Sequence, residues 1–410
     1  MSHMKSNFSS EFFSGNRARL RTLFSGSAPM IFTANGLMQR NSDIPFSFRQ
    51  DSNFWYLTGL DMPEAMLVID GDEEYLILPE MSPTDEVFGA PADLEIIKMK
   101  SGINDIVYMQ EGWPRLAKRL KKVQHAATLT ASPAFSKQYG FYTNPARKNL
   151  MRKLRNEQPD IELLDLRQHF MKMRMTKQKP ELDALKQAID ITTATMKKIE
   201  KKLATYKYEY EIEADLSHGF RSRGAQGHAF APIVAGGKNT CHLHYDKNND
   251  SLADVSILYI DTGAEVENYS ADITRTYTLK EAAKREKAVI EAVSVVAEYA
   301  RGNIKPGISI RENEKLVEQF MGEKLRELGL IKTNTHENVR KYYPHACSHY
   351  LGLDTHDTGD YDAPLEENMV LTVEPGIYIP EEGIGVRIED DVLVTKTGIK
   401  VLSEKLYNKL

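Results

Sequence analysis

Two strand-turn-strand patterns constrain the fold of this 410-residue chain most, because each places acidic residues inside apolar strands. In residues 256–279, one strand ends on Asp261 and the next carries Asp272 in its middle. A hairpin centred between Val266 and Glu267 would place the two aspartates directly opposite each other. Facing like charges destabilise an antiparallel pair, so we expect a positive charge between them.

The segment 369–395 repeats this design, with two apolar strands around a short turn. A hairpin centred between Glu381 and Glu382 would place Glu374 opposite Glu389. An unpaired carboxylate within an apolar strand costs on the order of several kcal/mol, which argues against an accidental position for Glu374. A single pair of this kind is compatible with solvent-facing strand residues. Two pairs of the same design favour a binding site for cations.

Four converging carboxylates and an imidazole are typical of a site for two divalent cations about 3.5–4 Å apart. Such a site deprotonates a bridging water near neutral pH and polarises a carbonyl oxygen, so the implied reaction is hydrolysis by a metal-bridging hydroxide. The motif HACSHYLGLDTHD offers His345, His349 and His356 as the imidazole, and no HExxH motif occurs. A Cys/His zinc site is a weaker alternative, because neither Cys241 nor Cys347 has a CxxC partner.

The pattern of apolar residues predicts two domains. Short apolar runs alternate with helical patterns over residues 5–168, which predicts an α/β domain; the runs are 30–34, 65–69, 75–78 and 127–129. A polar, basic stretch over 169–179 is predicted to be the linker. Residues 180–410 combine helical and antiparallel strand patterns, which predicts an α+β domain. Helices are expected over 180–203, 210–222, 280–301 and 311–328, and strands over 255–261, 271–279, 369–379 and 384–395.

Six sequence blocks carry a resemblance to a known family. DTGAEVENYSADITRTY, SHYLGLDTHDTG, TVEPGIYI and GIGVRIEDD resemble blocks of the metallopeptidase family with the pita-bread fold, which methionine aminopeptidase, prolidase and aminopeptidase P share. IVAGGKNTCHLHYDKN resembles a block of its proline-specific members, and FRQDSNFWYLTGLDMPEAMLVI is similar to the creatinase-like first domain of aminopeptidase P and prolidase. The resemblance implies a creatinase-like N-terminal α/β domain followed by a pita-bread catalytic domain.

The resemblance also implies which residues bind metal. It makes the ligands Asp261, Asp272, His349, Glu374 and Glu389. Asp272 and Glu389 would bridge the two metals. Asp261 would bind one metal alone, and His349 with Glu374 would complete the coordination of the other.

Further catalytic roles follow from the same resemblance. His244 and His356 match the two non-ligand histidines of the family, which steady a substrate carbonyl or transfer a proton. Arg387 lies two residues before Glu389 on the same strand face and is expected to contact the carboxylates, with a surface salt bridge as the alternative. Glu374 is expected to act in catalysis as well as in metal binding.

The amino-acid composition limits which binding partners and which cellular location we expect for this protein. Lys plus Arg (53) nearly balance Asp plus Glu (58), and this net charge of −5 argues against nucleic acid as a partner. No apolar stretch reaches the ~18 residues of a membrane span, and two cysteines suit a reducing compartment, so we expect a cytoplasmic protein without a membrane partner. Carboxylate-rich ligation favours Mn²⁺, with Zn²⁺, Co²⁺ and Fe²⁺ as alternatives. The resemblance implies a homodimer or homotetramer.

These observations predict a two-metal exopeptidase that releases the N-terminal residue from peptides with proline at the second position. Prolidase, which cleaves Xaa-Pro dipeptides, is the alternative within the same chemistry, although the FWYLTG block favours aminopeptidase P. A non-catalytic peptide-binding module and the metal-free creatinase are disfavoured, because the chain retains five candidate ligands. The short connection over 380–383 bears on fine specificity rather than on chemistry.

Overall fold

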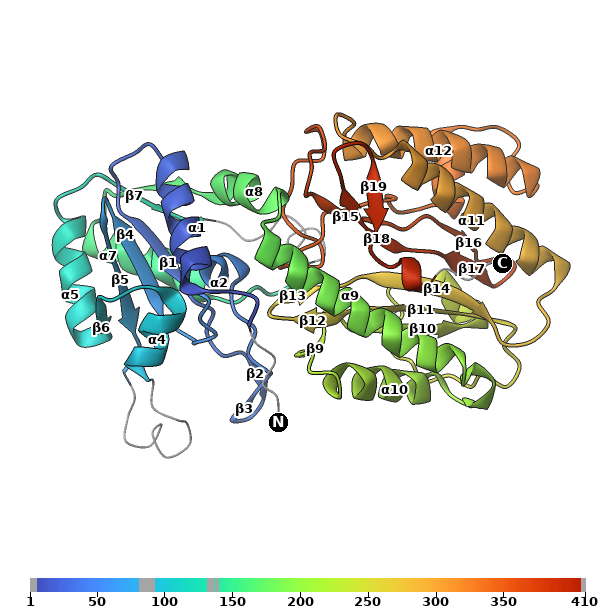
Figure 1. Ribbon diagram of the computed structural model, residues 1–410, viewed down its shortest axis with the longest axis horizontal. Coiled ribbons are helices and arrows are strands. Elements are labelled where there is room, and N and C mark those ends of the chain that lie inside the picture. The colour runs from blue at the N-terminus through green and yellow to red at the C-terminus, as the bar shows by residue number, and fades with distance from the viewer. Residues whose placement is uncertain (1–5, 81–92, 131–135, 137–139, 407–410) are drawn as a thin grey trace. The chain divides into compact units, whose positions relative to one another are not determined.

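The computed structural model describes residues 6–80, 93–130, 136 and 140–406, and the chain divides into two compact units (Figure 1). One unit comprises Phe8–Met173, and the other contains Ser6, Asn7 and the described residues from Arg174 onward. The division falls within helix α8 (Arg167–Met175), which covers much of the segment expected as a linker.

The first unit is built on a six-stranded sheet in the order β6-β5-β4-β1-β7-β8. Strand β4 runs antiparallel to both neighbours, whereas the other pairings are parallel. The strands are β1 (Met30–Thr33), β4 (Met66–Asp70), β5 (Glu73–Leu78), β6 (Ile106–Tyr108), β7 (His125–Thr128) and β8 (Glu162–Asp165). A separate hairpin consists of β2 (Gln39–Asn41) and β3 (Ile44–Pro45).

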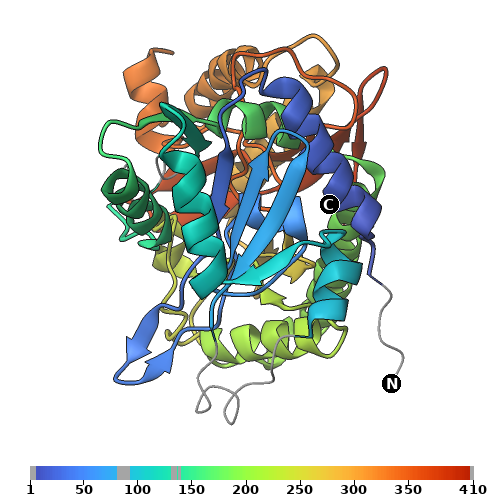
Figure 2. The ribbon, with the colours of Figure 1, turned by 90° about the vertical axis from the view of Figure 1, so that its left-hand side faces the viewer.

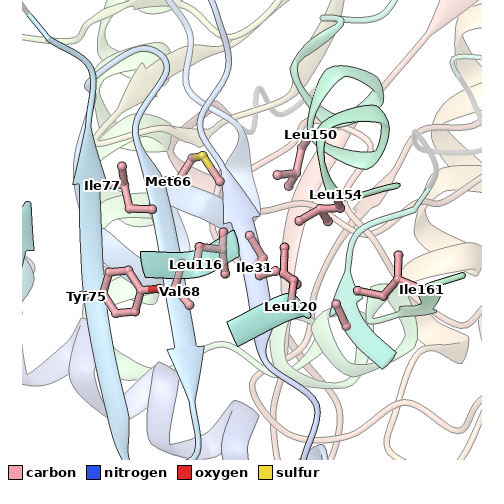
Figure 3. Packing of buried hydrophobic residues seen from close by; sticks show 11 residues of the cluster. Ile31, Met66, Val68, Tyr75, Ile77, Leu116, Leu120, Leu150, Leu154 and Ile161 are labelled. Atoms are coloured by element: carbon pink, nitrogen blue, oxygen red, sulfur yellow. The ribbon is translucent and has the colours of Figure 1, made fainter. Parts of the chain in front are cut away.

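Helices cover this sheet because their apolar stripes need a partner surface. The helices that precede α8 are α1 (Ser10–Leu23), α2 (Ser52–Thr58), α4 (Leu94–Ser101), α5 (Met109–Leu120) and α7 (Ala146–Glu157). Figure 2 turns this unit toward the viewer, with α5 in front of the strands. Figure 3 shows Leu116 and Leu120 of α5, with Leu150 and Leu154 of α7, packed against strand residues such as Ile31. The predicted α/β class of the first domain is confirmed.

The second unit combines long helices with antiparallel strands, as predicted for an α+β domain. Its helices are α9 (Lys179–Glu200), α10 (Glu209–Arg221), α11 (Lys284–Asn303), α12 (Ile310–Glu327) and α13 (His336–Tyr342). Helix α9 packs against β12 (Ala264–Val266) and β13 (Tyr269–Ser270). Helix α11 packs against three strands near the end of the chain (Figure 1), which are β15 (Val370–Val373), β16 (Gly376–Ile379) and β17 (Ile384–Arg387). Helix α11 begins four residues later than expected, where the Glu286 side chain accepts a hydrogen bond from the backbone N–H of Ala283 (2.7 Å). Helix α13 was not among the predicted elements.

The strands of this unit form short antiparallel sheets with the orders β10-β11-β14, β13-β12-β9, β15-β18-β19 and β16-β17. The predicted strands are present, but each hairpin is interrupted once near its acidic residues. The strands are β9 (Gly227–His228), β10 (Ile233–Gly236), β11 (Ile257–Thr262), β12 (Ala264–Val266), β13 (Tyr269–Ser270), β14 (Ile273–Thr278), β15 (Val370–Val373), β16 (Gly376–Ile379), β17 (Ile384–Arg387), β18 (Asp390–Val394) and β19 (Ile399–Val401).

Among the described residues, no helix combines the length and the apolarity that a membrane crossing requires.

Candidate metal centre

The first hairpin turns at Glu267 and Asn268, one residue later than predicted. Both residues have positive φ (48° and 67°), as a two-residue hairpin turn of type I′ requires. A shift of the centre by one residue moves each cross-strand partner by two, so Asp261 faces Thr274 rather than Asp272. The predicted direct pairing of the two aspartates is therefore wrong. Because the shift is even, both side chains still project from the same face of the hairpin.

Close backbone approach at Gly263 brings the end of β11 toward Asp272. A Cβ atom at Gly263 would lie 1.6 Å from the carbonyl oxygen of Ala271, so only glycine fits there. Asp272 follows directly and lies just outside β14. Burial is the main cause that raises the pKa of Asp272 well above its usual value, and the charge of Asp261 adds to it. The two aspartates thus interact without being cross-strand partners.

The second hairpin has the predicted register. Strands β15 and β18 pair Val373 with Asp390, and strands β16 and β17 pair Gly376 with Arg387. Glu374 and Glu389 occupy the opposed positions between these two ladders. The predicted pairing of Glu374 with Glu389 is confirmed.

The backbone N–H of each of these glutamates donates its hydrogen bond to a residue outside the second hairpin. The N–H of Glu374 donates to the carbonyl of Cys347 (2.8 Å), next to the histidine-bearing segment. The N–H of Glu389 donates to the carbonyl of Thr274 in the first hairpin (3.0 Å). The interruption in the second hairpin therefore binds it to both other parts of the site.

His349 faces the carboxylates of both hairpins. Its Nε2 lies 3.5 Å from Asp272 Oδ2 and 3.3 Å from Glu374 Oε1. Its Nδ1 lies 3.0 Å from the carbonyl oxygen of Tyr350, which can only accept, so Nδ1 carries the hydrogen and Nε2 presents a lone pair. Asp272, His349 and Glu389 each offer a ligand atom within 4.8 Å of the others. Burial lowers the pKa of His349 to about 4, so the ring is neutral near pH 7.

The electrostatics of this group fit divalent cations. Burial first, and neighbouring carboxylates second, raise the pKa of Glu374 and Glu389 well above the usual range. The Oδ1 atom of Asp261 is buried and has no hydrogen-bond partner among the described residues. A buried carboxylate oxygen without a partner, together with further buried carboxylates and a neutral imidazole nitrogen, forms the kind of donor set that hard divalent metals bind.

Arg387 is buried, with 3% of its surface exposed, and contacts one of the predicted ligand carboxylates, that of Asp261. Its Nη2 donates to Asp261 Oδ2, and its Nε donates to the hydroxyl of Thr274 (3.2 Å). Its guanidinium lies 4.6 Å from the centre of the Tyr259 ring. The alternative of a surface salt bridge does not fit this burial.

The other predicted histidines lie beside the centre. The ring of His356 is 4.4 Å from that of His349, centre to centre, and the His356 side chain is exposed. His244 is also exposed. Burial is the main cause that lowers the pKa of the neighbouring His345 to about 3, and the charge of Arg387 adds to it. Both ring nitrogens of His345 already have partners. Nδ1 lies 2.9 Å from the carbonyl oxygen of Ala346, and Nε2 lies 2.9 Å from the hydroxyl of Tyr378. Of the three histidines in the motif, the geometry favours His349 as the ligand.

Sequence reasoning missed Thr274 and Tyr378. The Thr274 hydroxyl donates to Glu389 Oε2 (2.6 Å), and the Tyr378 hydroxyl accepts from Arg387 Nη1 (2.8 Å). Thr274 lies two residues after Asp272, and Tyr378 lies four after Glu374, so the two-residue period of a strand was an available signal. The Cys/His zinc alternative has no support, because the group with ligand spacing in the described residues contains neither cysteine and both thiols are free.

Comparisons with known proteins identify similar proteins for both parts of the chain. Residues 183–396 match the model of metallopeptidase family M24, and residues 13–128 match the N-terminal domain of aminopeptidase P. The chain is 32% identical to Xaa-Pro aminopeptidase of Escherichia coli (strain K12), over 97% of this chain and 95% of that protein. It is 31% identical to Xaa-Pro aminopeptidase of Haemophilus influenzae, over 96% of this chain and 94% of that protein.

A solved structure of E. coli aminopeptidase P with the inhibitor Pro-Leu is similar to the chain, with a TM-score of 0.86 and 29% identity, covering 98% of this chain and 97% of that one. The family model spans the centre described above, and both relatives are similar along nearly their whole length. This chain therefore belongs to metallopeptidase family M24.

Proposed function

We propose that this chain is a metal-dependent aminopeptidase that hydrolyses the bond between an N-terminal residue and a following proline. The observation that carries the proposal is the convergence of His349 with acidic residues from both hairpins, in a chain similar to Xaa-Pro aminopeptidases along nearly its whole length. Those relatives support an aminopeptidase rather than prolidase as the main interpretation.

In this proposal two divalent ions are held by Asp261, Asp272, His349, Glu374 and Glu389. When bound, they would supply a water activated near neutral pH and a Lewis acid for the peptide carbonyl. The unpartnered Asp261 Oδ1 and the lone pair of His349 Nε2 support this ligand set. Asp272 and Glu389 are the proposed bridging ligands, as the family resemblance implies, and each offers a ligand atom within 4.8 Å of the one that His349 offers.

The remaining residues have proposed roles in positioning and proton transfer. Arg387 donates a hydrogen bond to one oxygen of Asp261, and the other oxygen has no hydrogen-bond partner among the described residues. His356 and His244 are the proposed groups that steady the substrate carbonyl and return a proton to the departing proline nitrogen. Glu374 is a proposed metal ligand and also a proposed proton acceptor. One of its oxygens accepts a hydrogen bond from the Thr372 hydroxyl (3.3 Å).

The proposed metal is Mn²⁺, because oxygen ligands with one imidazole and no thiolate suit it better than metals that prefer sulfur. Zn²⁺, Co²⁺ and Fe²⁺ are the alternatives that metal exchange would distinguish. We propose the cytosol as the location, since both cysteines are free thiols. A homodimer or homotetramer is the proposed assembly, and light scattering would measure it.

The decisive experiment measures metal and turnover together. Protein reconstituted with Mn²⁺ is expected to hold two ions per chain and to release the first residue of an Xaa-Pro-Xaa peptide. Asp272→Ala is expected to lose both ions and the activity. Asp190→Ala is the control, because Asp190 is about half exposed and pairs with Lys405 on the surface. Full metal content without turnover would instead indicate a non-catalytic peptide-binding module.

A further inference from the structure

The loop that joins His349 to His356 folds around one buried carboxylate, that of Asp357. The Asp357 side chain is 1% exposed. Its backbone N–H donates to the carbonyl of Tyr350 (2.8 Å), which closes the loop on itself. Its Oδ1 accepts from the N–H of Thr358 (2.9 Å). Asp357 therefore lies directly after His356 and beneath the loop that carries both histidines.

Two buried cations from the start of the second unit hold this carboxylate. Arg174 Nη2 donates to Asp357 Oδ1, and Lys177 Nζ donates to Asp357 Oδ2 (3.1 Å). Arg174 also bonds Asp354 Oδ2 (2.8 Å), one turn of the loop earlier. The Lys177 side chain is 0% exposed, and its ammonium also donates to the carbonyl of Arg174 (2.9 Å). The cations thus hold the loop at two points that flank His356.

The loop fits closely over this ion pair. A Cβ atom at Gly352 would lie 2.1 Å from Asp357 Oδ2 and 3.1 Å from Lys177 Cε. The carbonyl of Gly352 accepts a hydrogen bond from the N–H of Ser270 (2.9 Å), two residues before Asp272. The same loop therefore contacts the ion pair on one side and the aspartate-bearing hairpin on the other.

Stability alone is a weak reason for so many buried charges. A buried ion pair contributes little compared with a well-packed apolar replacement, since desolvation of the charges offsets their attraction. A buried pair does fix geometry, because an unpaired charge in the interior is strongly disfavoured. Neither Arg174 nor Lys177 belongs to the candidate metal group, and the contacts of their side chains with Asp354 and Asp357 connect them to the loop that carries His356.

We infer that Lys177 and Arg174, acting through Asp357, hold the imidazole of His356 in its position beside that of His349. This position determines how well His356 transfers a proton. The inference rests on the proposed function and adds to it three positioning residues that touch neither metal nor substrate. The 4.4 Å separation of the two imidazole rings is the geometry that this cluster maintains.

A double-mutant cycle between Lys177→Met and His356→Ala tests the inference, because coupled residues give non-additive effects. In the Mn²⁺-loaded enzyme, Lys177→Met is expected to keep two ions per chain, to leave KM within about threefold, and to lower kcat by about 10- to 100-fold. In the His356→Ala background, the same change is expected to alter kcat by less than about threefold. If Lys177→Met does not fold, the same cycle is measured with Asp354→Asn, which weakens the contact of Arg174 with the loop. Asp354 is 43% exposed, so this variant is expected to fold.

Arg17→Met is the matched control. It removes a buried cation from Glu74 in the first unit, and any loss of kcat that it causes is expected to multiply with that of His356→Ala. If the kcat losses of Lys177→Met and His356→Ala also multiply, or if Lys177→Met loses metal, the positioning role is refuted. A metal-loaded wild-type enzyme without any turnover would refute the proposed function itself, and this inference with it.

Discussion

The backbone N–H of Glu389 donates to the carbonyl of Thr274 (3.0 Å), and the hydroxyl of Thr274 donates to the Glu389 carboxylate (2.6 Å). These two bonds join the two hairpins through residues that are 115 positions apart in the chain. Thr274 faces Asp261 across the first hairpin, and Glu389 faces Glu374 across the second. One reciprocal contact therefore brings the two acidic pairs into a single site.

Thr274→Val is expected to weaken metal binding by about 10- to 100-fold, because the hydroxyl that orients Glu389 is lost while the side-chain volume is kept. The free energy of unfolding should fall by about 1–3 kcal/mol, since buried polar partners lose a hydrogen bond. Isothermal titration calorimetry with Mn²⁺ measures the metal affinity, and urea unfolding measures the free energy of unfolding. Thr278→Val is the control, because Thr278 is exposed on the same strand. Equal metal affinity in both variants would contradict the role given to Thr274.

His349→Ala and His356→Ala are expected to fail in different ways. His349→Ala should lose metal, because its Nε2 lies beside Asp272 and Glu374. His356→Ala should keep both ions and lose roughly 10²- to 10⁴-fold in kcat, the usual scale for a positioned proton-transfer group. Metal analysis beside steady-state kinetics separates the two outcomes. The opposite result would exchange the ligand between these two histidines.

Peptides of the form Xaa-Pro-Xaa are expected to be cleaved with higher kcat/KM than Xaa-Pro dipeptides. A dipeptidase would hold the free proline carboxylate with a cation, whereas Arg387, the cation nearest the ligands in sequence, is engaged by Asp261. Replacement of the proline by alanine should cost at least ~10-fold, about 1.4 kcal/mol of transition-state stabilisation. Kinetics on the three peptides measure both ratios. Activity confined to dipeptides would assign the chain to prolidase instead.

Glu181→Gln is expected to become more stable relative to the wild type as the pH rises. Burial raises the pKa of Glu181 from 4.5 to about 7, although the Gln178 N–H, the charge of Lys177 and the Tyr269 hydroxyl oppose this shift. The folded state therefore binds a proton that the unfolded state releases, so the wild type loses stability between about pH 4.5 and pH 7. The loss amounts to about 3 kcal/mol above pH 7. Thermal unfolding of both proteins from pH 5 to pH 8 measures the difference, and parallel curves would contradict the shift.

Alternation along the strands was enough to identify the acidic residues, because residues two apart share one face of a strand. It also gave the register of the second hairpin, whose turn over 380–383 closes at Gly383 with φ 66°. The first register failed because Glu267 and Asn268 are not glycine, and their left-handed backbone could not be inferred from the sequence pattern. The number and period of the long helices were predictable for the same local reason, while the start of α11 depended on a side-chain cap.

The sequence by itself determined the α/β and α+β patterns, the four acids within two strand-turn-strand segments, and the histidine motif that lies between those segments in the chain. The tertiary structure decided which atoms meet. The bonds of Glu389 to Thr274, of Glu374 to Cys347 and of Arg387 to Asp261 join segments far apart in the chain. No local periodicity encodes them, because they form only when burial removes water from these groups and each polar group must find a partner in the folded chain.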